Sequence, residues 1–388
     1  MPALEEKQLL LIPGPTPVPQ AVLRACARPM INHRGPEYAK LQNENVAGLK
    51  EMFQTKNGVL VLTCSGTGGM EAAVVNTLSP GDKVLVLVIG AFGKRFLKIA
   101  RAYGADAEEM EFTWGEAVDP NRVKERLAQD KNKEIKAVLV QHNETSTGVY
   151  NDLSVLGPII REHGALSLVD AVSGLIAIDC QTDNWGLDVV VAASQKAFML
   201  PPGLAFVCMN ERAWEAYKKA KMPRFYFDLG EARSFAEKGQ NPWTPALPQV
   251  YGLQEGLRLL RQEGLQNVFA RHQRLADAVR AGCKALGLEL FAKPANASNC
   301  ITAIKSPAGL GPDKIRKLLL EKYGLVLAGG QAHLKDSVFR VGHLGYVSET
   351  DILGCMAALG AGLKELGMKV DPGAGAGAAV ASLEGAKC

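Results

Sequence analysis

Short apolar runs alternate with amphipathic stretches through the first two thirds of the chain. Seven of these runs are predicted strands, and most of them are nearly continuously apolar, as expected for strands that helices cover on both faces. These runs are Val59–Thr63, Lys83–Ile89, Ala107–Phe112, Ala137–Gln141, Ala165–Val169, Leu187–Ala193 and Leu204–Met209. Helical spacing lies between them, at Gly69–Leu78, Gly93–Tyr103, Pro120–Ala128 and Leu153–His163. The alternation predicts an α/β domain with a mainly parallel sheet, in which ligands bind at the carboxyl ends of the strands.

The pattern changes after residue 245. Two long amphipathic stretches, Leu247–Arg261 and Leu265–Leu286, lead into weaker strands at Cys300–Ile304 and Val338–Val341 and a last helix at Glu349–Leu366. These elements predict a smaller C-terminal α+β domain, joined to the first by the long helix.

We therefore expect four parts along the chain. They are an N-terminal arm at residues 1–20, a large domain at 21–250, a small domain at 251–368 and a tail at 369–388. The tail is rich in glycine and alanine, so we expect it to be disordered.

Charge and cysteine usage narrow the class of protein. The chain has 388 residues and a formal net charge of +4, spread without a block of like charge, so we expect no nucleic-acid partner and no membrane partner. No apolar run approaches membrane-spanning length and the N-terminus does not resemble a secretory signal, so the expected location is cytoplasmic. The eight cysteines occur singly, without C-x-x-C pairs or histidine clusters, and we predict no metal site.

Three features at predicted strand ends could carry chemistry. The segment Ser65–Gly69 (SGTGG) fits an ordinary βα turn, or a turn whose glycines and helix N-terminus hold a phosphate. Asp170 fits a helix cap, or a buried anion beside a cationic heterocycle. Lys196 follows the run Leu187–Ala193 and fits a surface lysine, or an amine that burial makes nucleophilic.

Taken together, these features favour the chemical interpretation of each. A phosphate-binding turn, an aspartate and a lysine, in this chain order, are the contacts that pyridoxal phosphate requires. The turn anchors the phosphate, the aspartate keeps the pyridinium nitrogen protonated and the lysine forms the internal aldimine. We therefore predict a pyridoxal-phosphate enzyme with Lys196 as its catalytic residue.

Nine motifs follow one another in an order that identifies a family. They are PGPTPVP (13–19), HRGPEY (33–38), SGTGG (65–69), GAFGKRF (90–96), HNETSTGV (142–149), LVDAVSG (168–174), SQKAF (194–198), WTPALPQVYGL (243–253) and FRVGHLG (339–345). With them the chain resembles the class V branch of the fold-type I pyridoxal-phosphate aminotransferases, especially the alanine–glyoxylate, serine–glyoxylate and serine–pyruvate group. The resemblance covers nearly the whole chain. It implies a large domain with a mainly parallel seven-stranded sheet and a smaller C-terminal α+β domain.

The resemblance assigns residues to the cofactor's phosphate and to the faces of its ring. Thr67, Gly68 and Gly69 match the phosphate-binding turn, although some relatives have histidine at the position of Gly69, so one side-chain contact is absent. Phe92 matches an aromatic residue that stacks on one face of the ring, and Val172 matches the residue packed on the opposite face.

The resemblance also assigns the polar contacts of the ring. Thr145 matches a hydroxyl that bonds the phenolic oxygen, and Asp170 matches the partner of the ring nitrogen. Gln195 matches a residue that reaches the phosphate. Lys196 matches the Schiff-base lysine, which also moves the proton between the α-carbon of the amino acid and the C4′ position of the cofactor.

Two further assignments concern the substrate and a second subunit. Arg340 matches the arginine that binds the substrate carboxylate, for which a bidentate guanidinium is suited. The resemblance implies a homodimer with active sites at the subunit interface, in which Thr244 contacts the phosphate bound by the other copy. Asn241 stands where relatives often have tyrosine, so we assign it no role.

The resemblance implies a ping-pong transaminase that moves the amino group of alanine or serine to glyoxylate or pyruvate through a Lys196 aldimine. Beyond Arg340, no second cationic clamp for a dicarboxylate is apparent. The alternatives are a class V transaminase for aspartate or 2-aminoethylphosphonate, and a non-catalytic relative that serves as a subunit of a larger complex, such as a redox enzyme. A cysteine desulfurase is less favoured, because the candidates Cys300 and Cys355 lie in apolar contexts.

Overall fold

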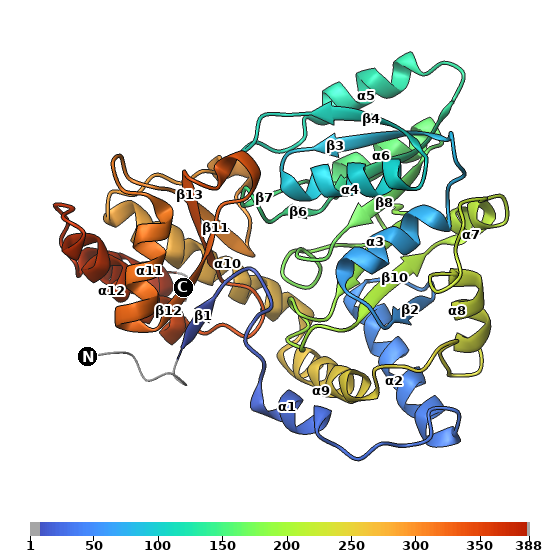
Figure 1. Ribbon diagram of the computed structural model, residues 1–388, viewed down its shortest axis with the longest axis horizontal. Coiled ribbons are helices and arrows are strands. Elements are labelled where there is room, and N and C mark those ends of the chain that lie inside the picture. The colour runs from blue at the N-terminus through green and yellow to red at the C-terminus, as the bar shows by residue number, and fades with distance from the viewer. Residues whose placement is uncertain (1–7, 386–388) are drawn as a thin grey trace.

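The computed structural model describes residues 8–385, which form two domains, each built on its own sheet (Figure 1). The sheet of the large domain has the strand order β2-β10-β9-β8-β5-β3-β4, and β10 alone runs against the other six. Its strands are β2 (Val59–Leu62), β3 (Lys83–Val88), β4 (Asp106–Glu111), β5 (Ile135–Gln141), β8 (Leu166–Asp170), β9 (Val189–Ala193) and β10 (Ala205–Met209). The predicted α/β class and the mainly parallel seven-stranded sheet are confirmed.

Alternating side chains on these strands build two separate cores. In β2, Val59 and Val61 pack on one face of the sheet and Leu60 and Leu62 on the other, because successive side chains of a strand point to opposite faces. The first face is covered by α1 (Gln20–Cys26), α2 (Pro36–Met52), α5 (Pro120–Gln129), α6 (Leu153–His163) and α9 (Leu247–Glu263). The second is covered by α3 (Gly66–Val75), α4 (Ala91–Ala102), α7 (Glu211–Tyr217) and α8 (Leu229–Ala236). Both faces are thus buried, which explains the nearly continuous apolar runs.

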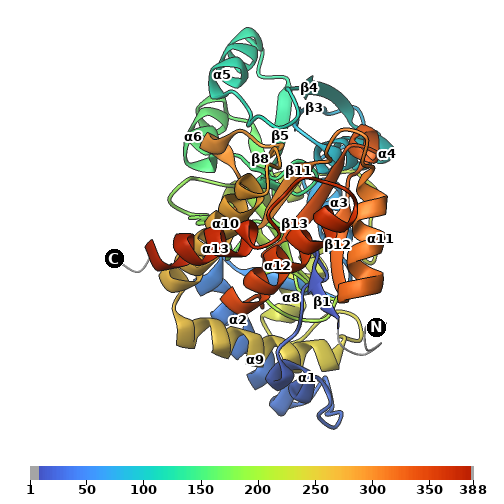
Figure 2. The ribbon, with the colours of Figure 1, turned by 90° about the vertical axis from the view of Figure 1, so that its left-hand side faces the viewer.

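The small domain packs its helices against one four-stranded sheet (Figure 2). The sheet has the order β1-β12-β13-β11, with strands β1 (Leu9–Leu11), β11 (Ile301–Lys305), β12 (Leu325–Gly329) and β13 (Val338–Gly342). Its helices are α10 (Leu265–Ala285), α11 (Pro312–Tyr323), α12 (Glu349–Glu365) and α13 (Ala374–Gly385). Short elements complete the fold: β6 (Asn143–Glu144), β7 (Val149–Tyr150), η1 (Pro294–Asn296) and η2 (Ala332–Leu334). The expected α+β domain is present.

The structure corrects three of the expected boundaries. The N-terminal arm is not separate, since β1 forms the edge of the small domain's sheet; residues 1–7 lie outside the described part. The boundary at 250/251 falls inside α9, whose apolar side chains pack in the core of the large domain.

The third correction concerns the tail. Residues 374–385 are not disordered but form α13, which buries Ala379 and Leu383 against the small domain. Alanine is the best helix former, and burial against α10 and α12 supplies the rest of the stabilisation. Residues 386–388 lie outside the described range.

Two kinds of feature are absent from residues 8–385. No helix there combines the length and apolarity that crossing a bilayer requires. No group of three or more His, Cys, Asp or Glu side chains in that range is placed to hold a metal ion.

Candidate active site

A cavity of about 200 Å³ lies where β8 and β9 end and α3 and α4 begin. Seven of the residues predicted from the sequence line it, namely Thr67, Phe92, Thr145, Asp170, Val172, Gln195 and Lys196. The other lining residues are Ser65, Gly66, Met70, Arg95, Asn143 and Ser173. The carboxyl edge of the parallel strands thus gathers side chains that are up to 131 positions apart in the sequence, from Ser65 to Lys196.

The N-terminus of α3 points free donors at this cavity. Gly66, Thr67 and Gly68 are the first three residues of the helix, so their N–H groups have no carbonyl one turn earlier to bond. Ser65 precedes them without a side-chain cap. Such a terminus binds anions through its N–H groups and its dipole.

Gly69 has a different role from the one expected. Its N–H donates to the Ser65 carbonyl at 3.2 Å, and Gly69 does not line the cavity. A Cβ on Gly69 would lie 2.7 Å from Val191 Cγ1 and 3.1 Å from Ala205 Cβ. Its position requires glycine because α3 packs directly on β9 and β10.

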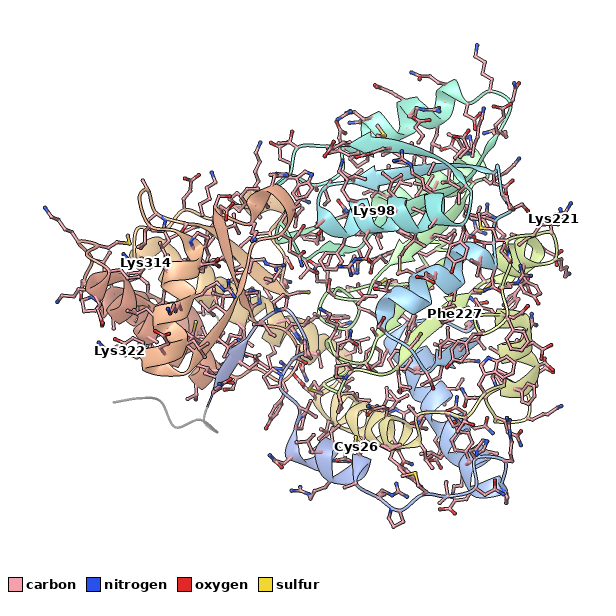
Figure 3. The ribbon with its side chains drawn as sticks, in the orientation of Figure 1. Cys26, Lys98, Lys221, Phe227, Lys314 and Lys322 are labelled. Atoms are coloured by element: carbon pink, nitrogen blue, oxygen red, sulfur yellow. The ribbon has the colours of Figure 1, made fainter. Side chains whose placement is uncertain are left out.

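Gly68 also lies outside the cavity wall. A Cβ there would lie 2.9 Å from the Cys64 side chain and 3.0 Å from Phe227, which Figure 3 shows beside α3. Within the predicted phosphate turn, Thr67 therefore lines the cavity. Gly68 and Gly69 instead allow α3 to begin close to the side chains that pack against it.

Lys196 differs from the surface lysines of the chain, such as Lys98 and Lys314 in Figure 3, because it faces the cavity beside Asp170. Burial lowers the pKa of the Lys196 amine to about 8, and the negative charge of Asp170 opposes this shift. Burial raises the pKa of Asp170 to about 6, and the hydrogen bond from Val172 N opposes that shift. Burial is thus the main cause of the pKa shift of both groups.

Thr145 belongs to a buried hydroxyl and amide network. Its Oγ1 lies 2.8 Å from Ser173 Oγ, which also accepts from Asn143 Nδ2 at 2.9 Å. Thr145 and Asn143 sit in or beside the β6–β7 hairpin, and Ser173 follows β8. The network fixes the Thr145 hydroxyl at the cavity wall. Neither Asn143 nor Ser173 was singled out from the sequence, although both lie within motifs quoted above.

Glu144 holds the start of α4, and with it Phe92. The backbone N–H groups of Phe92 and Gly93 each donate to Glu144 Oε2 at 3.0 Å. Ser146 donates to Oε1 through its N–H at 3.0 Å and its hydroxyl at 2.6 Å. Burial raises the pKa of Glu144, and these four donors oppose the rise.

Arg95 is a further residue that sequence reasoning missed. It lies one helical turn after Phe92, with its guanidinium carbon 4.6 Å from the centre of the Phe92 ring, and it lines the cavity. The i, i+3 spacing within GAFGKRF was the signal that could have placed the two side chains on one helix face. Arg95 therefore places a second cation at the cavity wall, while the expectation that the site has no second clamp for a dicarboxylate stays a prediction.

Arg340 is buried next to the cavity, on β13 of the small domain. Its Nε donates to the Gly329 carbonyl at 2.8 Å and its Nη1 donates to the Thr145 carbonyl at 2.9 Å. Burial lowers the pKa of Arg340 to about 10. The two carbonyls orient the guanidinium, and its Nη2 makes no hydrogen bond within residues 8–385.

Thr244 and Asn241 lie away from this cavity. Thr244 is exposed, so it does not contribute to the site of its own chain. Asn241 has a structural role, since it accepts from Tyr38 Oη at 2.5 Å and donates to the Val61 carbonyl at 2.8 Å. It thereby joins α2 to β2.

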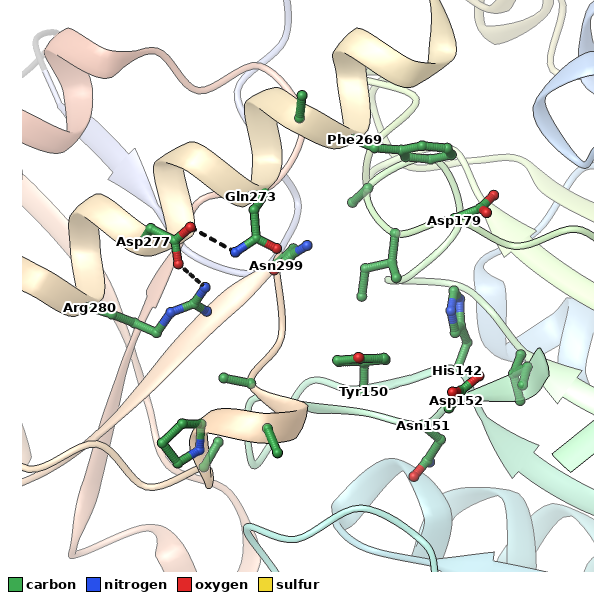
Figure 4. A pocket seen from close by; sticks show the side chains of 18 of the residues that line it. His142, Tyr150, Asn151, Asp152, Asp179, Phe269, Gln273, Asp277, Arg280 and Asn299 are labelled. Carbon is green, nitrogen blue, oxygen red and sulfur yellow. Dashed lines mark hydrogen bonds and ion pairs between the residues drawn. The ribbon is translucent and has the colours of Figure 1, made fainter. Parts of the chain in front are cut away.

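A larger cavity of about 910 Å³ opens between α10 and the large domain (Figure 4). In it Asp277 accepts hydrogen bonds from Gln273 and Arg280 of the same helix. Burial lowers the pKa of His142, on the opposite wall, to about 4. None of the predicted site residues lines this cavity, so size alone does not locate the chemistry.

Known proteins similar to this chain are mostly named as aminotransferases. The family model for class-V aminotransferases matches residues 9–351. A protein of Anabaena cylindrica named soluble hydrogenase 42 kDa subunit is 47% identical over 97% of this chain and 98% of its own length. The L-aspartate–glyoxylate aminotransferase of Paracoccus denitrificans is 39% identical over 95% and 94%. The serine–glyoxylate aminotransferase of Arabidopsis thaliana is 37% identical over 97% and 95%.

Solved structures agree with this pattern. The pyridoxamine–pyruvate aminotransferase of Mesorhizobium loti has a TM-score of 0.94 and 29% identity, over 99% of this chain and 100% of its own. An alanine–glyoxylate aminotransferase of Nostoc sp. has a TM-score of 0.88 and 30% identity, over 94% and 97%. The resemblance read from the motifs is confirmed: the chain belongs to the class-V aminotransferase family and is an aminotransferase.

Proposed function

We propose that this aminotransferase binds pyridoxal 5′-phosphate beside Lys196 and moves the amino group of alanine or serine to glyoxylate or pyruvate. The observation that carries the proposal is that Lys196 and Asp170 share one cavity with Thr145, whose carbonyl orients Arg340. The serine, aspartate and alanine aminotransferases of Arabidopsis thaliana, Paracoccus denitrificans and Nostoc sp. described above are each named for glyoxylate as well, which supports that acceptor.

The residues present fit the cofactor. Asp170 accepts from Val172 N at 3.0 Å through Oδ1, while its Oδ2 has no partner within residues 8–385 and can accept from a ring N–H. The N–H groups at the start of α3 suit a phosphate, and Phe92 and Val172 supply apolar surface for a flat ring. When bound, pyridoxal phosphate supplies a ring that withdraws electrons from the amino acid's α-carbon.

The chain's own groups divide the remaining work. The Lys196 amine, whose pKa burial lowers to about 8, takes up and returns the α-carbon proton through Nζ. Arg340 binds the substrate carboxylate through Nη2, with its other nitrogens already held by carbonyls. Phe92 and Val172 exclude water from the reacting atoms.

Half-reactions test this function. The purified yellow protein is mixed separately with alanine, serine and aspartate, and the loss of the yellow absorbance is followed, then its return with glyoxylate or pyruvate. We expect loss with alanine or serine and none in Lys196→Ala, which also lacks the initial colour. The proposal fails if no amino acid bleaches the wild-type protein.

A second candidate is an aspartate-using transaminase, and Arg95 favours it. Arg95 lines the cavity and makes no hydrogen bond or ion pair within residues 8–385, so its cation is available to a second carboxylate. The same position suits the phosphonate of 2-aminoethylphosphonate. Aspartate turnover that falls in Arg95→Gln, while alanine turnover does not, would support this candidate over the first.

A third candidate is a non-catalytic subunit of a larger complex, which the name of the Anabaena cylindrica relative keeps open. The complete set of Lys196, Asp170 and Arg340 argues for catalysis instead. Yellow protein without turnover in the half-reaction assay would support the subunit role.

The desulfurase alternative has less support. The Cys300 thiol donates to the Ser173 carbonyl at 2.9 Å, and burial raises its pKa to about 12. Burial also raises the pKa of Cys355, which is fully covered. A desulfurase needs an accessible thiolate, and neither candidate supplies one.

The proposal includes a homodimer, in which Thr244 of one copy reaches the phosphate bound by the other. Thr244 is exposed beside Trp243, which stacks on Phe225 at 4.9 Å between ring centres, and Phe225 is 75% exposed. Exposed aromatic clusters of this kind are typical of protein interfaces. Sedimentation of the wild type and of Phe225→Asp tests the dimer. The cytoplasmic location stays a prediction.

A further inference from the structure

Residues 12–16, which we call the strap, cross over Lys196 between the two domains. Leu9–Leu11, just before the strap, pairs with β12 of the small domain. At the other end, Thr16 N donates to the Gln195 carbonyl at 3.2 Å and Thr16 Oγ1 donates to the Lys196 carbonyl at 3.1 Å. The strap is therefore tied to the small domain on one side and to the lysine loop on the other.

The middle of the strap contacts the reactive amine. Lys196 Nζ donates to the Pro13 carbonyl at 2.5 Å, its one hydrogen bond within residues 8–385. Gly14 follows with a φ of +131°, and a Cβ there would lie 2.6 Å from Nζ and 2.9 Å from Cδ and Cε of the lysine. Only glycine leaves room for the amine at this distance.

Two glycines of the small domain, Gly342 and Gly345, pack against the strap and hold it in place. A Cβ on Gly342 would lie 2.3 Å from the Ile12 carbonyl oxygen and 2.9 Å from Pro13 N. A Cβ on Gly345 would lie 2.9 Å from the Lys196 carbonyl oxygen and 3.0 Å from Thr16 Oγ1. The backbone of the motif that carries Arg340 thus packs directly on the strap, so the Pro13 carbonyl has little freedom to move.

The geometry points to the strap as a positioning element for the proton transfer: the Pro13 carbonyl holds one N–H of Lys196 whenever the amine is free, and so aims its lone pair. An amine that rotates about its Cε–Nζ bond presents its lone pair in several directions, and anchoring one N–H removes most of this freedom. This inference rests on the proposed function, because it concerns the same amine and the same proton.

Gly14→Ala tests the contact in the full chain without cofactor. Competitive labelling with acetic anhydride across a pH series, read by mass spectrometry of the Lys196 peptide, gives the midpoint at which the amine becomes reactive. A carbonyl acceptor stabilises the ammonium form, so displacing Nζ from Pro13 is expected to lower that midpoint. Gly81→Ala is the control for backbone strain, since Gly81 has a φ of +83° and a Cβ added there would meet no atom within 4 Å.

An unchanged midpoint in Gly14→Ala, or an equal shift in Gly81→Ala, would overturn the inference. Where Gly14→Ala fails to fold, Thr16→Val serves instead, because it removes the hydroxyl that ties the strap to Lys196 and keeps the volume. Thr16→Ser should restore the wild-type midpoint. Thr77→Val is the matched control, because it removes a buried hydroxyl that donates to the Ala73 carbonyl at 2.7 Å, outside the cavity.

The active enzyme supplies a second readout. With an amino acid deuterated at its α-carbon, we expect Gly14→Ala to lower kcat by about 100-fold, the scale of a misplacement of 1 Å, with little change in KM and a larger isotope effect. A fall in kcat with no isotope effect would contradict a role in proton transfer. If no amino acid is a substrate, the proposed function fails while the labelling result still decides whether the strap holds Lys196.

Discussion

The sharpest test of the site's architecture is Gly69→Ala, because two effects of known size oppose each other there. Alanine in a helix interior is more favourable than glycine by about 1 kcal/mol. Against this, the new methyl would lie 2.7 Å from Val191 Cγ1 and 3.1 Å from Ala205 Cβ, both on central strands and fully buried. Neither neighbour is the end of a flexible side chain, so α3 itself has to move.

Crowding of this kind costs about 1–3 kcal/mol, which equals or exceeds the gain in helix propensity. We therefore expect Gly69→Ala to lower the free energy of unfolding by up to about 2 kcal/mol. Moving α3 outward also shifts the free N–H groups of Gly66, Thr67 and Gly68, so the affinity for pyridoxal phosphate should fall in the same variant.

Urea unfolding followed by circular dichroism measures the first effect, and titration with the cofactor measures the second. Gly354→Ala is the matched control, because Gly354 is exposed inside α12 and its Cβ would meet only Leu9 Cδ2, at 3.7 Å. At Gly354 only the helix propensity of alanine over glycine acts, and we expect the free energy of unfolding to rise by about 0.5–1 kcal/mol. The reasoning is refuted if Gly69→Ala is as stable as Gly354→Ala.

Three further predictions follow from the charges around the cavity. Burial lowers the pKa of Lys196 from 10.5 to about 8, so between these pH values the unfolded chain binds more protons at this residue than the folded chain does. The stability of the cofactor-free protein, measured as the midpoint of urea unfolding, should therefore rise from about pH 8 to 10.5. Lys196→Met should abolish this rise. In Arg340→Lys the ammonium group cannot make both hydrogen bonds of the guanidinium, to the Gly329 and Thr145 carbonyls, so kcat/KM for the amino donor should fall by about 100-fold while the cofactor affinity stays the same. Activity equal to that of the wild type would show that the guanidinium geometry is not used. Glu144→Gln turns an amide NH₂ toward backbone donors and should cost about 1–3 kcal/mol in unfolding free energy, whereas the exposed Glu162→Gln should be within error of the wild type.

Local sequence determined the framework of the large domain. All seven predicted strands are present. Six of them are buried on both faces and therefore need nearly unbroken apolar runs, which are visible without knowledge of their partners, whereas the edge strand β4 carries four acidic residues. The placement of Asp170 and Lys196 followed as well, since parallel strands bring their carboxyl ends to one edge wherever they lie in the sequence.

Elements that depend on contacts between distant segments were not predicted, because the sequence around them does not show those contacts. The short β1 is a strand only because it pairs with β12, more than 300 residues later, and α13 is ordered only because α10 and α12 cover its apolar side chains. A segment with a weak intrinsic preference takes its structure from such partners.

The candidate active site, too, was determined partly by the sequence and partly by the tertiary structure. Residue type and position at a strand end pointed to the lysine and the aspartate, and the resemblance to the family pointed to the arginine. Only the tertiary structure showed that Gly69 serves packing, that Glu144 fixes α4, and that the Pro13 carbonyl lies 2.5 Å from the Lys196 amine. These roles depend on the backbone groups and empty space around each residue, and only the packing of the two domains against each other determines those.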